Sequence, residues 1–121
     1  MGDVTFLPHY FRTLDETPLE VFAMLAPDFR FSFLWSTGDE AREFAGGLEE
    51  YEGYMRQREP DGQLHHIGFG AREGRREVVT GWTTKNGDPL ASFTFAVELD
   101  EQDRAKRLFA ARTPAFGGQV F

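Results

Sequence analysis

The stretch from Leu25 to Trp35 constrains the fold more than any other part of the chain, because it predicts a β-strand with one aromatic face. Large apolar residues recur there with a period of two, which is the spacing of side chains on one side of a strand. These residues are Phe29, Phe31, Phe33 and Trp35, and polar residues alternate with them. An aromatic face of this size has to be covered by other elements of the same domain.

Three segments have the apolar spacing of amphipathic helices. The first is Phe6 to Leu14, before the aromatic strand. The second, Pro18 to Leu25, begins with the residues of a capping box, Thr17 as N-cap and Glu20 at the third helical position. The third, Leu48 to Arg58, follows the strand and carries an acidic face that is typical of a solvated helix.

The second half of the chain predicts a meander of antiparallel strands: His65 to Glu73, Arg76 to Lys85, Pro89 to Leu99 and Ala105 to Arg112. Asn86 and Gly87 predict a type I′ hairpin turn, because both residues tolerate positive φ. Residues Glu40 to Phe44 are too short and mixed to assign. The tail, Thr113 to Phe121, is expected to be flexible or to fold over an opening.

Composition limits the classes of function. A chain of 121 residues is expected to form one domain, and its net charge of -7 argues against binding to nucleic acid or to an anionic membrane surface. The chain has 0 Cys, which excludes disulfides and thiolate chemistry. We expect a soluble, cytoplasmic protein, since no apolar run approaches a membrane span or a signal peptide.

The order of these elements and four segments resemble the nuclear transport factor 2-like superfamily, above all SnoaL-like and ketosteroid-isomerase-like proteins. The segments are Y-F-R-T-L-D-E-T at 10–17, L-A-P-D-F-R-F at 25–31, F-A-G-G-L-E-E-Y at 44–51 and F-A-V-E-L-D-E-Q-D-R at 95–104. The resemblance implies an α+β fold of residues 1–121, in which three helices pack on a strongly curved, mostly antiparallel sheet that forms a conical pocket, as in cystatin-like α+β barrels. It also implies a homodimer through the sheet.

Carried over residue by residue, the resemblance places Tyr10 at the family's pocket tyrosine. Phe33 and Phe95 fall where the isomerases keep their two catalytic carboxylates, so a standard ketosteroid isomerase mechanism is not available to this chain. The same alignment predicts which strand residues face the pocket: His65, Ile67, Phe69, Val78, Thr80, Trp82, Leu108, Ala110 and Arg112. His66 would then face outward.

His65 is the first candidate for a general base or a ligand-orienting group, because an imidazole exchanges protons near neutral pH. The alternative is a structural histidine at a sheet end. Tyr10 could donate its hydroxyl to a carbonyl or enolate oxygen, or simply pack its ring. His65 and His66 cannot share a metal ion, since neighbours on a strand point to opposite faces, and we expect no metal site.

We therefore expect a protein that binds a small, apolar, ring-containing molecule. It would transform that molecule by proton transfer in a cyclisation, dehydration or isomerisation without a cofactor, or else act as a non-catalytic ligand-binding or dimerisation module. A cavity of a few hundred Å³ that reaches Tyr10 and His65 would favour a ligand. The expected ligand-binding residues are Phe29, Phe31, Phe33, Trp35, Phe69, Trp82, Phe93, Phe95 and Arg112.

Overall fold

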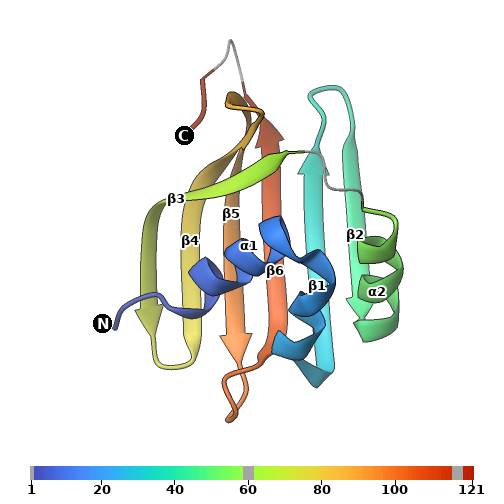
Figure 1. The fold of residues 1–121 in the computed structure, drawn as a ribbon, viewed down its shortest axis with the longest axis vertical. Coiled ribbons are helices and arrows are strands. Elements are labelled where there is room, and N and C mark those ends of the chain that lie inside the picture. The colour runs from blue at the N-terminus through green and yellow to red at the C-terminus, as the bar shows by residue number, and fades with distance from the viewer. Residues whose placement is uncertain (1, 59–61, 116–118) are drawn as a thin grey trace.

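The structure is a computed structural model and describes residues 2–58, 62–115 and 119–121. Its elements in chain order are α1 (Phe6–Glu16), the 3₁₀ helix η1 (Pro18–Met24), β1 (Leu25–Ser36), β2 (Ala41–Gly47), α2 (Leu48–Arg56), β3 (Gln63–Glu73), β4 (Arg76–Lys85), β5 (Asp88–Leu99) and β6 (Ala105–Pro114). Figure 1 shows α1 lying across the sheet and α2 beside its β2 edge. No helix among the described residues is long and apolar enough to cross a membrane.

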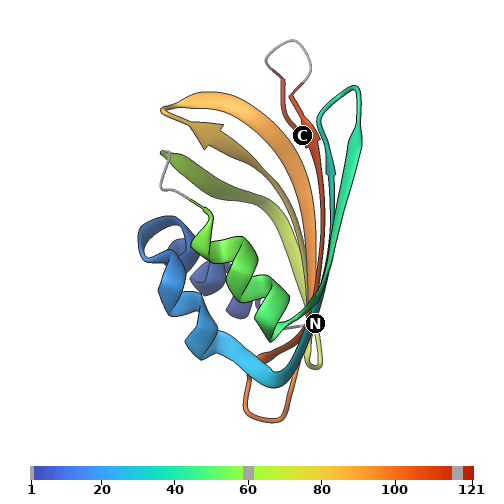
Figure 2. The same cartoon turned by 90° about the vertical axis from the view of Figure 1, so that its right-hand side faces the viewer.

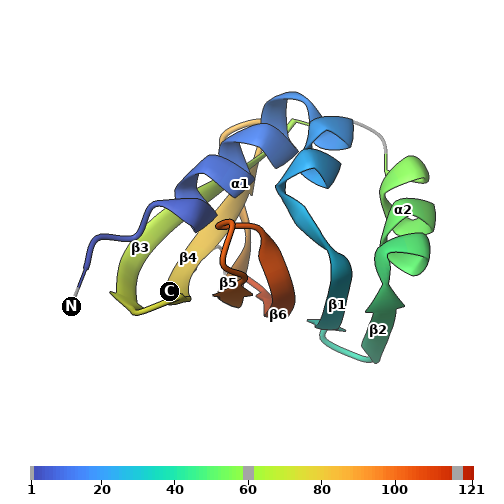
Figure 3. The same cartoon turned by 90° about the horizontal axis from the view of Figure 1, so that it is seen from below.

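The strands form one curved sheet in the order β2-β1-β6-β5-β4-β3. β1 pairs with β6 in parallel, and the other neighbouring pairs are antiparallel. The sheet does not close, because β2 and β3 form its two edges. Figures 2 and 3 show all helices on the concave side of this sheet. The expected α+β fold with three helices on a curved, mostly antiparallel sheet is confirmed.

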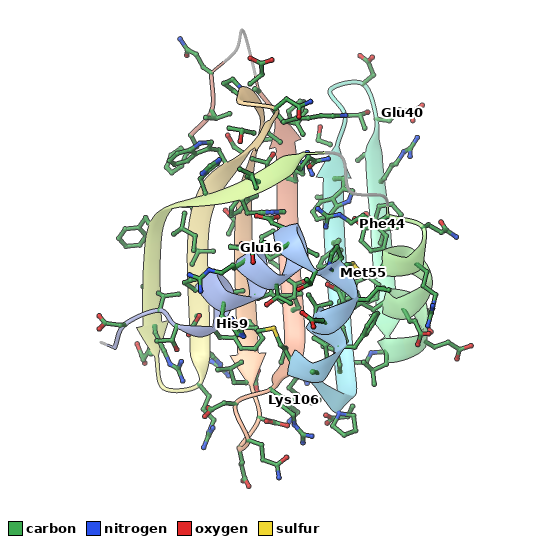
Figure 4. All side chains as sticks on the ribbon, in the orientation of Figure 1. His9, Glu16, Glu40, Phe44, Met55 and Lys106 are labelled. Atoms are coloured by element: carbon green, nitrogen blue, oxygen red, sulfur yellow. The ribbon has the colours of Figure 1, made fainter. Side chains whose placement is uncertain are left out.

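The aromatic strand is β1, and its residues alternate between buried and exposed as predicted. Phe29, Phe31 and Phe33 face the helices, and the ring of each lies within about 6 Å of the Tyr51 ring from α2. Met55, also on α2, is buried next to β1, whereas His9 and Glu40 lie at the surface (Figure 4). The core therefore fills the space between the concave face and the helices.

Glu77 of β4 anchors the start of α1, which the sequence did not predict. Its side chain is 0% exposed, and its carboxylate accepts backbone N–H groups from Thr5, Phe6 and Leu7 at 2.9–3.0 Å. Arg72 donates to the same carboxylate at 2.8 Å. Burial works to raise the pKa of Glu77, but these donors outweigh it and lower that pKa. The first amide groups of a helix lack partners within it, so a buried carboxylate there fixes the helix on the sheet.

Two local predictions need correction, and one stretch that the sequence left unassigned is a strand. The segment from Pro18 forms a 3₁₀ helix, and Thr17 makes no side-chain capping bond; the Glu20 N–H donates to the Thr17 carbonyl oxygen instead. α2 ends at Arg56 rather than at Arg58. The unassigned stretch, Glu40 to Phe44, falls mostly in β2, the second strand of the first hairpin. β2 is an edge strand with mostly exposed residues, so it has no apolar alternation by which it could be predicted.

The prediction that Val78, Thr80 and Trp82 face the concave side is wrong. Asn86 and Gly87 do form the turn with positive φ, but Leu90 is an extra residue in β5, so Thr84 pairs with Pro89 while Thr83 pairs with Ala91. One extra residue reverses which side chains share a face. The buried residues of β4 are consequently Glu77, Val79, Gly81 and Thr83.

Phe69 is also placed wrongly by simple alternation. The register of β3 against β4 shifts between Ile67 and Phe69, so that Phe69 turns away from the core and is 64% exposed. Beside this bulge, Gly81 lets the two strands approach closely. A Cβ atom on Gly81 would lie 1.9 Å from the carbonyl oxygen of His66.

The end of the tail lies on the convex side of the sheet. Thr113 and Pro114 end β6, and the backbone N–H of Phe121 donates to Ser92 Oγ at 2.8 Å. Ser92 alternates with the inward-facing Ala91 and Phe93, so this contact is on the convex side. Residues 116–118, on which part of the tail prediction falls, lie outside the described residues.

Candidate functional site

A cavity of about 430 Å³ lies between the helices and the concave face of the sheet. Its size is in the range of small-molecule sites. Residues from both the helices and the sheet contribute to it: from α1, from α2 and the segment after it, and from every strand except β2. The cavity is lined by Tyr10, Leu14, Phe33, Trp35, Tyr51, Tyr54, Met55, Gln57, Arg58, Gln63, His65, Thr83, Phe93, Phe95 and Arg112.

His65, at the start of β3, is paired with Asp15, near the end of α1. The Nδ1 atom of His65 lies 2.6 Å from Asp15 Oδ1, and the backbone N–H of His65 donates to Asp15 Oδ2 at 2.8 Å. The two side chains are only 6% and 8% exposed. Because an ionised carboxylate only accepts hydrogen bonds, this geometry puts a proton on Nδ1 and leaves the lone pair of the neutral ring on Nε2.

The rings around His65 fix its orientation and affect its charge. Phe11 stacks on the imidazole with centroids 5.0 Å apart and planes 6° apart, and Phe93 lies 5.6 Å away. Burial lowers the pKa of His65 below its ordinary value, although the hydrogen bond and the charge of Asp15 oppose this effect. The imidazole is therefore neutral at pH 7 and able to accept a proton.

A pair of hydrogen-bonded tyrosines forms a second polar group in the cavity wall. The hydroxyl groups of Tyr10 on α1 and Tyr51 on α2 contact each other, and both side chains are buried. Burial raises the pKa of both phenols, so both stay protonated at neutral pH. One proton joins the two oxygens, and the other remains available for donation to a ligand oxygen.

The two polar pairs border the same aromatic ring. The centroid of Phe95 lies 6.4 Å from that of Tyr10 and 6.3 Å from that of His65. A flat ligand on this ring would lie near both a base and a hydrogen-bond donor. Such a pairing is what proton abstraction next to a carbonyl group requires.

Sequence reasoning located part of this site. Of the predicted residues, the cavity is lined by Tyr10, Phe33, Trp35, His65, Phe93, Phe95 and Arg112. Phe29 and Phe31 are in the core beneath it and do not line it. Phe69 and Trp82 lie on the other side of the sheet, and Trp82 stacks on His66 with centroids 5.5 Å apart.

Several residues of the cavity region were missed, and those whose polar groups matter most to the site are Asp15, Tyr51, Arg58 and Thr83. Asp15 could have been found, because it lies four residues after Phe11 and so on the same buried side of α1. The apolar spacing that predicts the helix from Leu48 to Arg58 includes Tyr51 but indicates no polar role for it. Among the described residues, no group of three or more His, Cys, Asp or Glu side chains is arranged to hold a metal ion.

No protein-family model and no curated protein matches the sequence. Solved structures do match the fold. A proposed ketosteroid isomerase from Kribbella flavida DSM 17836 is 20% identical with a TM-score of 0.65, over 92% of this chain and 77% of that one. IdmH from Streptomyces antibioticus, a proposed polyketide cyclase, is 9% identical with a TM-score of 0.68, over 88% of each chain.

An NTF2-like protein of unknown function from Cytophaga hutchinsonii ATCC 33406 is 15% identical with a TM-score of 0.58, over 92% of both chains. Identities this low are informative about the fold and leave the activity open.

Proposed function

We propose that this chain, which has the NTF2-like fold, binds a small ring-containing molecule in the cavity and transfers a proton on it. Nε2 of His65 would be the base, and Asp15 would hold the imidazole in the tautomer that keeps this atom unprotonated. The Tyr10–Tyr51 pair would donate to the oxygen on which negative charge develops. Cyclisation, dehydration and isomerisation all fit such a step, and none of them needs a cofactor.

The observation that carries the proposal is the buried Asp15–His65 pair at the wall of a 430 Å³ cavity. A histidine that serves only to join two elements gains nothing from a cavity beside its ring. Burial of an ionisable pair is costly unless it is well bonded, and perturbed groups at a cavity are markers of function. Two of the solved structures with this fold are proposed to be an isomerase and a cyclase, which agrees with proton-transfer chemistry.

The proposal can be tested without the natural substrate. Exchange of the acidic α-protons of bicyclic ketones such as 2-tetralone for deuterium can be followed by ¹H NMR in D₂O. We expect His65→Gln to reduce the protein-catalysed exchange by roughly 10²- to 10⁴-fold, the usual contribution of a positioned base. His9→Gln is the matched control, because His9 is exposed on the outer side of α1 (Figure 4).

Two results would separate the alternatives. Unchanged exchange in His65→Gln would reject His65 as the base. If native mass spectrometry finds no retained ligand and no ketone is bound or exchanged, the cavity is not a catalytic site and the chain is a non-catalytic module. Tyr10→Phe adds a second check, because it removes one of the two hydroxyl groups of the proposed donor pair while keeping the ring that packs against Phe95.

The exposed convex face favours one further role, dimerisation with a second copy of the chain. Phe109 of β6, Ala96 of β5 and Val78 of β4 lie in one row across three adjacent strands. Phe109 is 47% and Val78 44% exposed, and large apolar side chains gathered on one face often mark an interface. Sedimentation equilibrium should show a dimer that Phe109→Glu converts to a monomer; a wild-type monomer would contradict this proposal.

A further inference from the structure

Two arginines bring positive charge to the cavity. Arg58 follows α2, and its backbone N–H donates to the Met55 carbonyl oxygen at 3.2 Å, which fixes its position. Arg112 lies on the inward side of β6, in register with Trp35 of β1 and with Phe93 of β5. Both arginines line the cavity and both are partly exposed, so they lie where the cavity meets solvent.

The charge of this wall is opposite to that of the chain. The sequence has 20 Asp and Glu against 13 Lys and Arg, yet among the described lining residues there are two arginines and no Asp or Glu. The nearest acid described at the site is Asp15, whose two oxygens are already bonded to His65. No described carboxylate forms an ion pair with Arg58. The described lining of the cavity is therefore positive in an acidic protein.

Arg58 acts on both polar pairs of the site. Burial dominates the raised pKa of Tyr10 and of Tyr51, and the charge of Arg58 opposes it; the same charge helps burial to lower the pKa of His65. An anion at Arg58 would thus lie within electrostatic range of the whole site.

Thr83 indicates that a polar atom belongs deeper in the cavity. Its side chain is 1% exposed and lines the cavity, and Oγ1 has no hydrogen-bond partner among the described residues. Thr83 pairs in register with His65 on the neighbouring strand. A buried hydroxyl without a partner is unfavourable, so a ligand atom that bonds to it would be stabilised.

We propose that the ligand is a ring-containing organic acid whose carboxylate is bound by the guanidinium groups of Arg58 and Arg112. Its ring would lie against Phe33, Phe93 and Phe95, and a second polar atom would reach Thr83 and His65. The guanidinium group is planar and matches a carboxylate with two parallel hydrogen bonds. The inference rests on the proposed function, because it names the class of molecule that the same cavity would bind.

The test compares acids with neutral molecules of the same shape. Isothermal titration calorimetry would measure the binding of 2-naphthoic acid, cyclohexanecarboxylic acid and the amide of each. We expect the wild-type protein to bind each acid about ten- to a hundredfold more tightly than its amide, as for loss of a hydrogen bond to a charged group. Higher salt should reduce this preference.

Arg58→Met keeps the length of the side chain and removes its charge, so it should remove most of the preference for the acids. Arg56→Met is the matched control: Arg56 lies two residues earlier, pairs with Glu52 at 2.7 Å and does not line the cavity. Circular dichroism melting would establish that both variants fold.

The outcomes distinguish this inference from the proposed function. Two results would overturn the acid inference and leave ligand binding intact. One is equal binding of acids and amides. The other is a preference for acids that Arg58→Met leaves unchanged while Arg56→Met removes it. Failure of every acid and amide to bind would reject both. The acid inference would be supported if the preference for acids is lost in Arg58→Met and kept in Arg56→Met.

Discussion

Replacement of Asp15 by Asn tests the arrangement at His65 with a change of one atom. Both oxygens of Asp15 accept a hydrogen bond, one from the His65 backbone N–H and one from the ring at Nδ1. An amide has one oxygen and one NH₂ group and cannot accept both. If its oxygen takes the backbone N–H, its NH₂ faces Nδ1, and the ring proton must then move to Nε2. If it takes the ring, a backbone N–H loses its acceptor.

The first arrangement removes the proposed base, and the second costs stability. A buried donor without an acceptor costs about 1 to 3 kcal/mol, and these side chains are 6% and 8% exposed, so solvent does little to reduce that figure. With a slope typical of urea unfolding, the midpoint would fall by roughly 0.5 to 1.5 M. Loss of the Nε2 lone pair would reduce proton transfer by about 10²- to 10⁴-fold.

The pH dependence gives a further check on Asp15→Asn. Burial holds the folded-state pKa of His65 below its ordinary value, so its neutral form stabilises the fold above pH of about 6.5 and this contribution is lost as the pH falls toward the folded-state pKa. Both influences that raise this pKa come from Asp15. The variant should therefore titrate at still lower pH, and its destabilisation should grow on acidification.

The assay is ¹H–¹⁵N NMR of the histidine rings, together with urea unfolding. We expect a proton on Nδ1 in the wild-type protein and on Nε2 in Asp15→Asn. Asp28→Asn is the control, because Asp28 is an exposed carboxylate on β1. The reasoning is refuted if Asp15→Asn keeps the proton on Nδ1 and its free energy of unfolding stays within about 0.5 kcal/mol of wild type, the range of ordinary surface changes.

Two predictions concern the fold that holds the site. Glu77→Gln should lower the free energy of unfolding by about 3 to 5 kcal/mol at pH 7. The buried carboxylate accepts from four donors, and the amide replaces one of its two acceptor oxygens by an NH₂ donor. Since the folded-state pKa of Glu77 is lowered, its contribution is present above pH of about 4.3 and is lost as the pH falls through the lower folded value; urea unfolding of wild type and variant should converge in acid. Gly81→Ala should destabilise by roughly 1 to 3 kcal/mol, because the added carbon meets the His66 carbonyl oxygen, whereas Gly53→Ala in α2, with nothing within 4 Å, should stabilise by about 0.5 to 1 kcal/mol. Equal melting temperatures for the two alanine variants would contradict the close approach at Gly81.

The sequence correctly predicted the strand faces that depend on local periodicity. It predicted the wrong face where one extra residue changes the register of a strand pair. β1 was correct because its burial follows a strict period of two over many residues. The face of β4 was wrong although the Asn86–Gly87 turn was right, because the bulge at Leu90 follows the turn and has no local signature. The same reason applies to Phe69 on β3.

The sequence predicted several rings of the cavity and the polar candidates Tyr10 and His65, but not their polar partners, Tyr51 and Asp15. Rings on strands can be recognised by their alternation, whereas Asp15 and His65 are 50 residues apart and meet only when α1 docks on the sheet. Glu77 and the residues at the helix start that it binds are 70 to 72 residues apart. Such pairs are set by docking geometry, which no pattern within a single segment records.

The two phenylalanines at the positions of the isomerase carboxylates can be considered together with the Asp15–His65 pair. Phe33 and Phe95 occupy the positions where the resemblance leads one to expect acids, and they make that part of the cavity apolar. Among the described residues that line the cavity, the proposed base is His65, which bonds to Asp15 at the junction of α1 and β3. The rings of Tyr10 and His65 both lie within about 6.5 Å of the Phe95 ring, so the proposed base and the proposed donor share one aromatic neighbour. The proposed proton transfer would therefore use residues other than the two carboxylates of the isomerases.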